Sequence, residues 1–275
     1  NEFQYAAYVA SNRGDLTGDS ISEQTFQLIS GRFRDEAVQA YAPWSGTYLG
    51  KGEIRNAYVC ERRRNMVFAL GNMDHVEPGT PVASLDRLRI QEGNVIGQLD
   101  NVLTVTILVY LFRLGFQGTI LLSAQEEAGR SWRYLLEWFQ REDFATDKLL
   151  VLDTSPYPDL ESASAQEIVL RRRDTHAEFN QPYVRELEEV CRSMGMTCAY
   201  KEEYIAHSNV ARAMEGKAPR SLGSTELGRL IAASNRSITG ATLQVPTVGY
   251  HTPFETARMA SVQAMLNIVR KLSIH

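Results

Sequence analysis

Short apolar runs, separated by amphipathic segments, set the strongest limit on the fold of this 275-residue chain. The runs GTILL (118–122) and KLLVL (148–152) have the length of strands and no apolar–polar alternation, and ATLQVPTV (241–248) is similar. A strand that is apolar on both sides has to be covered on both faces, as in parallel or mixed sheets between two layers of helices. The pattern therefore predicts an α/β fold, a three-layer α/β/α sandwich with a mixed, mostly parallel central sheet.

Most segments between these runs have helical periodicity. The segment 102–114 is closed by Gly115, a residue favoured just past a helix end. It is too short to span a bilayer and contains Arg113, so we expect a buried helix. Two strands joined near Arg63–Asn65 are expected within 56–74, and a more exposed strand within 167–173. Further helices are expected at residues 26–33, 35–42, 131–142, 182–195, 225–234 and 254–272.

The composition fits a globular protein. Hydrophobic residues make up 44% of the chain and charged residues 23%, which is enough for a full core. The net charge is −4 and no basic run is longer than RRR, at 62–64 and 171–173, where we expect solvated strand edges. We therefore expect neither a nucleic-acid nor a membrane partner. No repeat or linker divides the chain, so we expect one catalytic domain over 1–275, without an inserted lid or dimerisation domain.

The cysteines bear on the cellular compartment. Cys60, Cys191 and Cys198 are an odd number and lack metal-binding spacing, which favours reduced thiols over a disulfide framework. The first residues contain no signal-peptide pattern. We expect a cytoplasmic protein.

Acidic residues and one histidine follow the strand-like runs. In α/β sheets, ligands bind beyond the carboxyl ends of the strands, where loops meet at one rim. Taken singly, each residue has a simpler explanation: a helix N-cap, a turn residue, or a solvated carboxylate at the start of a helix. Together they predict a metal site at that rim. The residues are Asp74, Asp100, Glu126, Glu127, Asp153 and His251.

The segments GNMDHVEPGT, GQLDN, SAQEEAG, VLDTSP and VPTVGYHTPFETA, in this order, resemble the five metal-site blocks of the co-catalytic zinc aminopeptidases. That clan also includes carboxypeptidases and N-acyl amino-acid deacylases. The resemblance extends from about Asn65 to the C-terminus, and it is to the compact, single-domain, glutamyl-aminopeptidase-like members. It implies that Asp100 bridges two metals, that Glu127 and His251 complete one site, and that Asp153 belongs to the other.

The resemblance also implies that Glu126 is the general base, which explains two adjacent glutamates. One would bind metal while its neighbour accepts a proton from the attacking water. Carboxylate and imidazole ligands suit zinc, and zinc makes water a nucleophile near neutral pH. The implied activity is hydrolysis of small peptides or acylated amino acids.

The first block departs from the family pattern. Asn72 stands where the family has a metal-binding histidine, which Asp74 would orient. The site built on Asp153 therefore has only oxygen donors, which hold zinc poorly and suit Mn, Mg or Co better. His75 is near, but strand alternation predicts that it points away from residue 72.

Three interpretations of the substitution stay open. The protein hydrolyses with one firm zinc site and one weak or empty site, it binds a peptide-like ligand or a partner without turnover, or Asn72 is an engineered inactivation. A nucleotide-binding protein is disfavoured because no glycine-rich loop follows a strand. For substrate recognition, Arg130 and Arg172 either meet a carboxylate or are solvated. An oligomer is compatible with the sequence.

Overall fold

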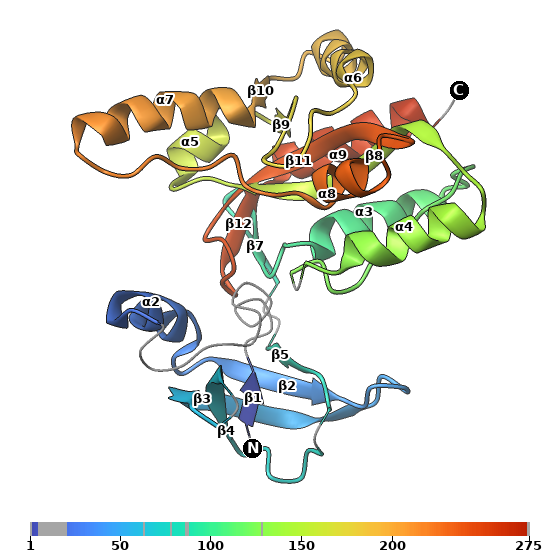
Figure 1. The fold of residues 1–275 in the computed structure, drawn as a ribbon. Coiled ribbons are helices and arrows are strands. Elements are labelled where there is room, and N and C mark those ends of the chain that lie inside the picture. The colour runs from blue at the N-terminus through green and yellow to red at the C-terminus, as the bar shows by residue number, and fades with distance from the viewer. Residues whose placement is uncertain are drawn as a thin grey trace. The chain divides into compact units, whose positions relative to one another are not determined.

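A computed structural model describes residues 2–4, 21–62, 64–77, 79–85, 88–127 and 129–273. The chain divides into two compact units (Figure 1). The smaller unit contains Asn1–Arg87, Glu127–Gly129 and His251–Pro253, and the larger contains Leu88–Glu126, Arg130–Tyr250 and Phe254–His275. Each unit buries hydrophobic core residues of its own. One catalytic domain over 1–275 stays a prediction.

The described part of the smaller unit contains an antiparallel sheet and a helix. The strand order is β1-β4-β3-β2-β5. Its core contains Ile29, Val38, Ile54 and Phe68. The helix begins after Ser22, whose Oγ accepts a hydrogen bond from the Thr25 N–H at 3.2 Å. The elements are β1 (Glu2–Gln4), α2 (Glu23–Phe33), β2 (Ala37–Tyr41), β3 (Tyr48–Cys60), β4 (Asn65–Gly71) and β5 (Val82–Ser84).

Two sequence predictions fall in this unit. The hairpin within 56–74 is confirmed as β3 and β4, with Arg63 itself outside the described residues. The helix predicted at 35–42 is wrong, because these residues form β2. Val38 and Ala40 are buried while the residues beside them are half-buried, the alternation of a strand. Pairing with β3 and β5 overrides the helix preference of a segment rich in Ala, Glu and Gln.

The larger unit is built on a mixed sheet. The strand order is β10-β9-β11-β12-β7-β6, and β8 also pairs with β11. The mixed sheet is confirmed, but among the described strands only β8–β11 and β9–β10 are parallel, so the expectation of mostly parallel pairing is wrong. The strands are β6 (Arg89–Gln91), β7 (Asn94–Gly97), β8 (Thr146–Pro156), β9 (Ile168–Leu170), β10 (Cys198–Tyr200), β11 (Ile238–Val248) and β12 (Glu255–Arg258).

Helices cover the central strand β11, which is buried along nearly its whole length. Leu243 and Val245 share a core with residues of α3, α6 and α9, whereas Ile238 packs with residues of α4 and α8. The mixed α/β fold is therefore confirmed. The helices are α3 (Val102–Arg113), α4 (Ser131–Arg141), α5 (Leu160–Ser164), α6 (Gln181–Ser193), α7 (Lys201–Met214), α8 (Glu226–Ala233) and α9 (Met259–Leu272).

Several local predictions need correction. Residues 118–122 form no strand; Leu121 instead packs beside Phe139 of α4. Helix α3 is only partly buried, since Thr104, Ile107 and Leu111 face the core while Phe112 is exposed. Strand β9 is fully buried rather than exposed, because β10 and β11 flank it on both sides. The segment 254–272 begins as strand β12, because β12 pairs with β7 before α9 starts.

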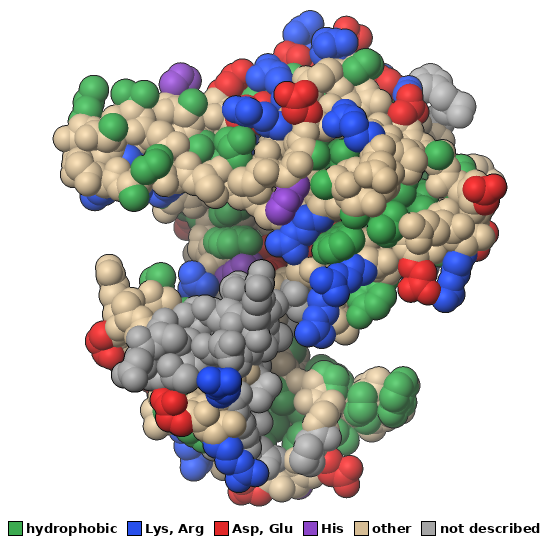
Figure 2. All heavy atoms as spheres, viewed as in Figure 1, with side chains coloured by type: hydrophobic (Ala, Val, Ile, Leu, Met, Phe, Trp, Pro, Cys, Tyr) green, Lys and Arg blue, Asp and Glu red, His purple; other side chains and the backbone are tan. Residues whose placement is uncertain are grey.

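The surface carries charges of both signs. Figure 2 shows acidic and basic side chains interspersed over the α6 end of the larger unit, as the modest net charge leads one to expect. Within the described part of the chain, no helix has the length and apolar character needed to cross a bilayer.

Candidate active site

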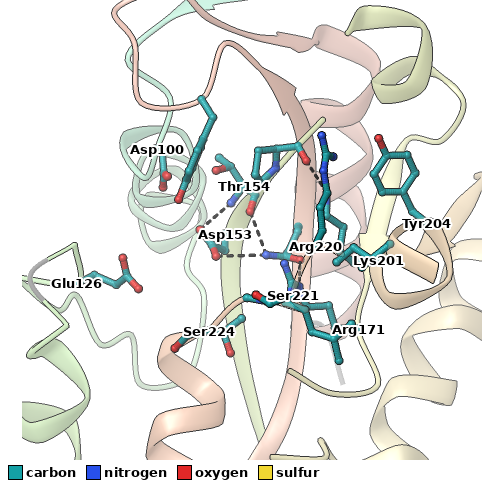
Figure 3. Close-up of a pocket in the computed structure, with 17 residues that line it drawn as sticks. Asp100, Glu126, Asp153, Thr154, Arg171, Lys201, Tyr204, Arg220, Ser221 and Ser224 are labelled. Carbon is teal, nitrogen blue, oxygen red and sulfur yellow. Dashed lines mark hydrogen bonds between the residues drawn. The ribbon is translucent and has the colours of Figure 1, made fainter. Parts of the chain in front are cut away.

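A cavity of about 340 Å³ lies in the larger unit near the carboxyl end of β8. Acidic residues line one side of it: Asp100, which precedes α3, Glu126, which precedes α4, and Asp153 of β8 (Figure 3). Basic residues line the other side: Arg171, which follows β9, Lys201 at the start of α7, and Arg220 in the connection to α8. The rim of the sheet that the sequence points to is thus a charged cavity.

Asp153 is held in place by two hydrogen bonds. Its Oδ1 accepts from the backbone N–H of Thr154 at 2.7 Å, and its Oδ2 accepts from Nε2 of Gln244 at 3.2 Å. Burial, and next the nearby Asp100 carboxylate, raises the pKa of Asp153 to about 8. A cation beside this carboxyl would favour its ionised form, so the environment suits a cation ligand.

A chain of polar contacts extends from Asp153 through the core of the unit. Oε1 of the buried Gln244 accepts from Nε of Arg171 at 2.9 Å. Arg171 then donates through Nη1 to the carbonyl of Leu222 at 2.7 Å. Arg171 is only 8% exposed, so the expectation that RRR at 171–173 forms a solvated edge is wrong for its first member. These contacts fix Gln244, and Gln244 orients the Asp153 carboxylate.

The turn that carries Asp100 is anchored by a buried carboxylate. Oε2 of Glu255 accepts from the backbone N–H groups of Leu99 and Asp100, at 2.7 and 2.8 Å. The N-cap of α3 is Asn101 rather than Asp100, and Asn101 donates through Nδ2 to the carbonyl of Leu152 in β8 at 2.9 Å. The Asp100 side chain therefore does not serve as a helix cap.

The two adjacent glutamates have different surroundings. Glu126 lines the cavity, whereas Oε1 of Glu127 lies 3.0 Å from Nε2 of His251. This contact brings a carboxylate and an imidazole together, two donor types that zinc accepts. The role that the resemblance implies for Asp100, as a ligand shared with this pair, stays a prediction.

The first block of the resemblance lies in the smaller unit. Asn72 follows β4 as an exposed residue with φ +60°, a left-handed conformation that asparagine tolerates better than most residues. Asp74 is exposed as well. Nε2 of His75 lies 3.0 Å from the carbonyl oxygen of Leu49, so this ring is engaged with the backbone. The roles implied for Asn72 and Asp74 stay predictions.

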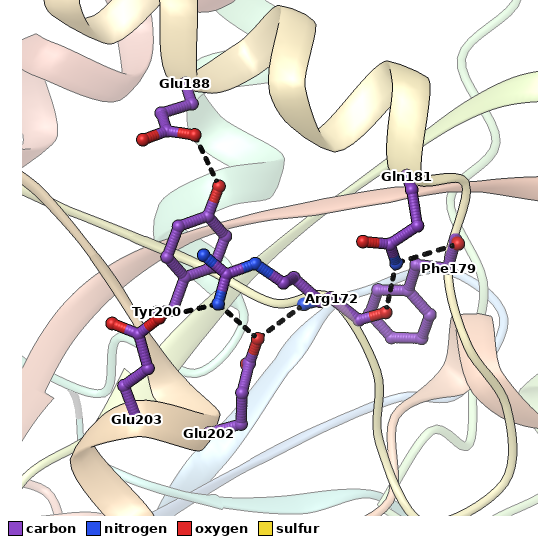
Figure 4. Close-up of polar contacts among 7 residues, drawn as sticks. All are labelled: Arg172, Phe179, Gln181, Glu188, Tyr200, Glu202 and Glu203. Carbon is purple, nitrogen blue, oxygen red and sulfur yellow. Dashed lines mark hydrogen bonds and ion pairs between the residues drawn. The ribbon is translucent and has the colours of Figure 1, made fainter.

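Arg172 is engaged within the protein rather than in the cavity (Figure 4). Its Nη1 pairs with Glu203 at 2.6 Å and Glu202 at 3.5 Å, and the guanidinium lies 3.3 Å from the centre of the Tyr200 ring. Arg130 is an exposed residue at the N-cap of α4. These contacts give Arg172 a structural role at the start of α7.

Sequence analysis missed the basic side of the cavity. Lys201 and Arg220 do not follow an apolar run, so no sequence pattern marks them as cavity residues. Arg171 is the first residue of the basic run RRR at 171–173, and such a run is typical of a solvated surface. Sequence analysis also missed Gln244 and Glu255, although Glu255 lies inside the segment HTPFE that carries the resemblance. The location of Glu255 in that segment is the sequence feature that could have indicated its role.

No protein-family model matches the sequence, and neither does a curated protein. Solved structures do match. The TET1 peptidase of Pyrococcus horikoshii superposes with a TM-score of 0.61 at 14% identity over 88% of this chain and 72% of that chain. A TET aminopeptidase from a Thaumarchaeota archaeon superposes with a TM-score of 0.62 at 15% identity, over 89% of this chain and 71% of that chain. Aminopeptidase I from Clostridium acetobutylicum superposes with a TM-score of 0.54 at 10% identity, over 89% of this chain and 70% of that chain. This chain has the fold of these aminopeptidases.

Proposed function

We propose that this chain is a metal-dependent exopeptidase-like hydrolase, an aminopeptidase or a related amidohydrolase, that acts on small peptides or acylated amino acids. The observation that carries the proposal is that Asp100, Glu126 and Asp153 line one cavity. The contact of Glu127 with His251 supports the remaining part of the implied ligand set. The fold shared with TET and other aminopeptidases supports the same reaction class.

Zinc is the proposed ion at the group that contains His251. Asp100, Glu127 and His251 would hold it, and Asp100 would also reach a second ion beside Asp153. That second site would have oxygen donors only, with Asn72 in the family's histidine position, so we propose that it is weak or empty and takes Mn, Mg or Co in preference to zinc. Bound zinc supplies a Lewis acid and lowers the pKa of water to about 7.

The residues of the cavity have separate proposed roles. Glu126 accepts the proton of the attacking water and later returns it to the leaving amine, as a general base and then a general acid. Gln244 holds the Asp153 carboxylate in one orientation through its hydrogen bond. Asp74 orients the residue at position 72 in the family pattern, and with Asn72 there this role is reduced.

The second candidate is a catalytically silent homologue that binds a peptide-like ligand or a partner. The observation in its favour is Asn72, since an amide is a poor replacement for an imidazole ligand. The retained Glu126, which a pure binder does not need, favours catalysis.

Cellular setting is part of the proposal. The TET1 peptidase is described as assembling into a tetrahedron or a large octahedral shell. We propose that this chain also forms an oligomer. The three cysteines are free thiols, which supports a reducing, cytoplasmic location.

Elemental analysis of protein purified without chelators, followed by assays on aminoacyl-p-nitroanilides, dipeptides and N-acetyl amino acids, tests the proposal. We expect bound zinc and hydrolysis that chelation removes and zinc restores. Bound zinc without hydrolysis of any substrate class would support the silent homologue. Protein that neither retains nor takes up a divalent metal would contradict both the metal site and the reaction.

A further inference from the structure

Two cysteines meet where helix α6 ends and strand β10 begins. Cys191 lies in the last turn of α6, and Cys198 is the first residue of β10. Cys191 is buried in the core of the larger unit, and Cys198 packs against the same core. Their thiols form a side-chain hydrogen bond with each other. Neither cysteine lines the cavity of the candidate active site, so the two sulfurs are a separate pair of reactive groups.

A second contact between α6 and β10 fixes the position of this pair. The hydroxyl of Tyr200 donates to Oε2 of Glu188 at 2.8 Å (Figure 4). Glu188 precedes Cys191 by three residues in α6, so both side chains lie on one face of the helix. Tyr200 follows Cys198 by two residues in β10, so both side chains point to one side of the strand. The Tyr200–Glu188 hydrogen bond therefore holds α6 and β10 in the register that places the two sulfurs together.

The two thiols differ in exposure and in acidity. Cys191 is fully buried, whereas Cys198 is only half-buried and lies on a strand at one end of the described sheet. The hydrogen bond from Cys191 lowers the pKa of Cys198, and the same bond, together with burial, raises the pKa of Cys191. The thiolate is the nucleophilic form of cysteine. Cys198 is thus the accessible nucleophile, with a second thiol in contact with it.

We propose that Cys198 and Cys191 are a dithiol site that hydroperoxides oxidise to a disulfide, with Cys198 as the attacking thiol and Cys191 as the resolving thiol. An accessible thiolate beside a resolving cysteine is the arrangement that such oxidation favours. In a reducing compartment the disulfide would be transient, because cellular thiols reduce it. The inference does not depend on hydrolytic activity.

The oxidation has two steps, written here for hydrogen peroxide. The Cys198 sulfur attacks one oxygen and the O–O bond breaks, which gives a sulfenic acid on Cys198. The other oxygen leaves as water with the proton that the Cys198 thiol gave up. The Cys191 sulfur then attacks the Cys198 sulfur, the S–O bond breaks, and a second water leaves with the Cys191 proton. Two thiols lose two hydrogen atoms, and the peroxide is reduced to two waters.

The site lies on a strand that leads directly to the cavity. Strand β10 ends at Tyr200, and the next residue, Lys201, begins α7 and lines the cavity. A disulfide would replace the hydrogen bond between the thiols by a covalent link from α6 to the first residue of β10. Oxidation at this site would therefore tether the strand that carries Lys201.

Peptide mapping of the full chain after treatment with hydrogen peroxide and alkylation of the remaining thiols tests the inference. Trypsin cleaves after arginine and lysine, so the two cysteines fall in separate peptides, 186–192 and 193–201. We expect these peptides to be found linked, with a mass lower by two hydrogen atoms than the sum of the two, and to be released by dithiothreitol. The alkylated forms of both peptides should be lost in parallel.

Cys60 is the internal control in the same sample. It is a half-buried cysteine of β3 in the smaller unit and should stay alkylatable at the peroxide concentration that links the other two. Cys191→Ser removes the resolving thiol but keeps a hydroxyl that can donate a hydrogen bond to Cys198. In this variant we expect loss of the linked peptides and accumulation of a sulfenic acid on Cys198, trapped by dimedone. Cys60→Ser should leave the link unchanged.

Two results on the wild-type protein would overturn the inference. One is equal alkylation of all three cysteines after peroxide treatment, and the other is sulfinic acid on Cys198 without linked peptides. Both are measured without a variant, so the test does not require Cys191→Ser to fold. Neither result bears on the proposed hydrolysis, which is measured by its own assays.

Discussion

Asp153 in the cavity of the larger unit and the Glu127–His251 pair of the smaller unit differ in chemistry and in exposure. Asp153 offers oxygen among buried neighbours such as Gln244, which is 1% exposed. His251 and Glu127 offer nitrogen and oxygen, with side chains 22% and 48% exposed. The first is a well-oriented carboxylate in a cavity whose described lining residues include no histidine, and the second is a mixed donor pair that is partly open to solvent. One acidic residue, Asp100, is proposed to serve both.

This difference shows that the orientation of a ligand side chain and the type of its donor atom are separate requirements of a metal site. Hydrogen bonds from Thr154 and Gln244 hold Asp153 in one orientation, yet orientation cannot replace a missing nitrogen donor. The Glu127–His251 pair has a carboxylate and an imidazole, the donor types that suit zinc. We therefore expect unequal metal occupancy, with a firmly bound ion at His251 and a weakly bound or absent ion at Asp153.

The largest effect is expected from Glu126→Gln, which tests the proposed general base of the hydrolysis. The amide cannot accept a proton, so kcat should fall about 10²–10⁴-fold while bound metal and fold are retained. Steady-state kinetics and metal analysis of the same preparation measure both quantities. Glu142→Gln, a change of an exposed glutamate outside this cavity, is the control. Full activity in the Glu126 variant would remove the residue from the mechanism.

Removal of the nitrogen donor should weaken the firm site most. We expect His251→Ala to lower zinc affinity by about 100-fold or more, because loss of a hydrogen bond to a ligand alone typically costs 10–100-fold. Competition with a chromogenic chelator measures this change. His207→Ala, which alters an exposed histidine of α7 that is not among the candidate ligands, should have no effect. Unchanged zinc affinity in the His251 variant would contradict the proposed ligand set.

Asn72→His would sharpen the comparison by supplying the donor that the family has. We expect zinc stoichiometry to rise toward two and hydrolysis to rise or appear, because an imidazole suits zinc better than an amide oxygen does. Zinc titration with a parallel activity assay measures both. If the unmodified protein already binds two zinc ions with equal, high affinity, another residue has replaced the histidine, and His75 would be the first to test.

Lys201→Met is expected to have a smaller effect, on the pH dependence of the free energy of unfolding, and it tests how strongly the buried Lys201 side chain is desolvated. The pKa of Lys201 is about 7 in the folded protein and 10.5 in its unperturbed form. Between these values the unfolded chain binds more protons than the folded chain, so this residue makes the free energy of unfolding rise with pH. From pH 6.5 to 8.5, wild type should gain about 1–2 kcal/mol relative to Lys201→Met. Denaturation at both pH values measures the difference; equal changes would show that Lys201 is not desolvated.

The sequence predicted the elements whose signal is local. Helices α4 and α6 follow from apolar residues repeated on one face, and β8 from its continuous apolar run. Strand β2 was missed because its residues prefer helix and only pairing with β3 and β5 makes it a strand. Residues 118–122 look like a buried strand, but the burial of Leu121 beside α4 satisfies the same apolar character.

The candidate site divides in the same way. Asp100 and Asp153 could be predicted to lie at one rim because Asp153 ends an apolar strand-like run and Asp100 directly precedes a helix. Glu126 lines the same cavity although the run before it, 118–122, forms no strand. Lys201, Arg220 and Gln244 could not be predicted, because their places depend on tertiary packing between segments that are far apart in the chain. A single basic or amide residue has no periodicity, and only the folded protein shows which cavity it lines.

The carboxylate of Glu255 that holds the Asp100 turn has a consequence for the timing of folding. Its hydrogen bond to the Asp100 N–H spans 155 residues of sequence. At a synthesis rate of 5–20 residues per second, the turn waits roughly 10–30 s on the ribosome before its anchor exists. The backbone geometry of the Asp100 turn is therefore among the last features of the nascent chain to form.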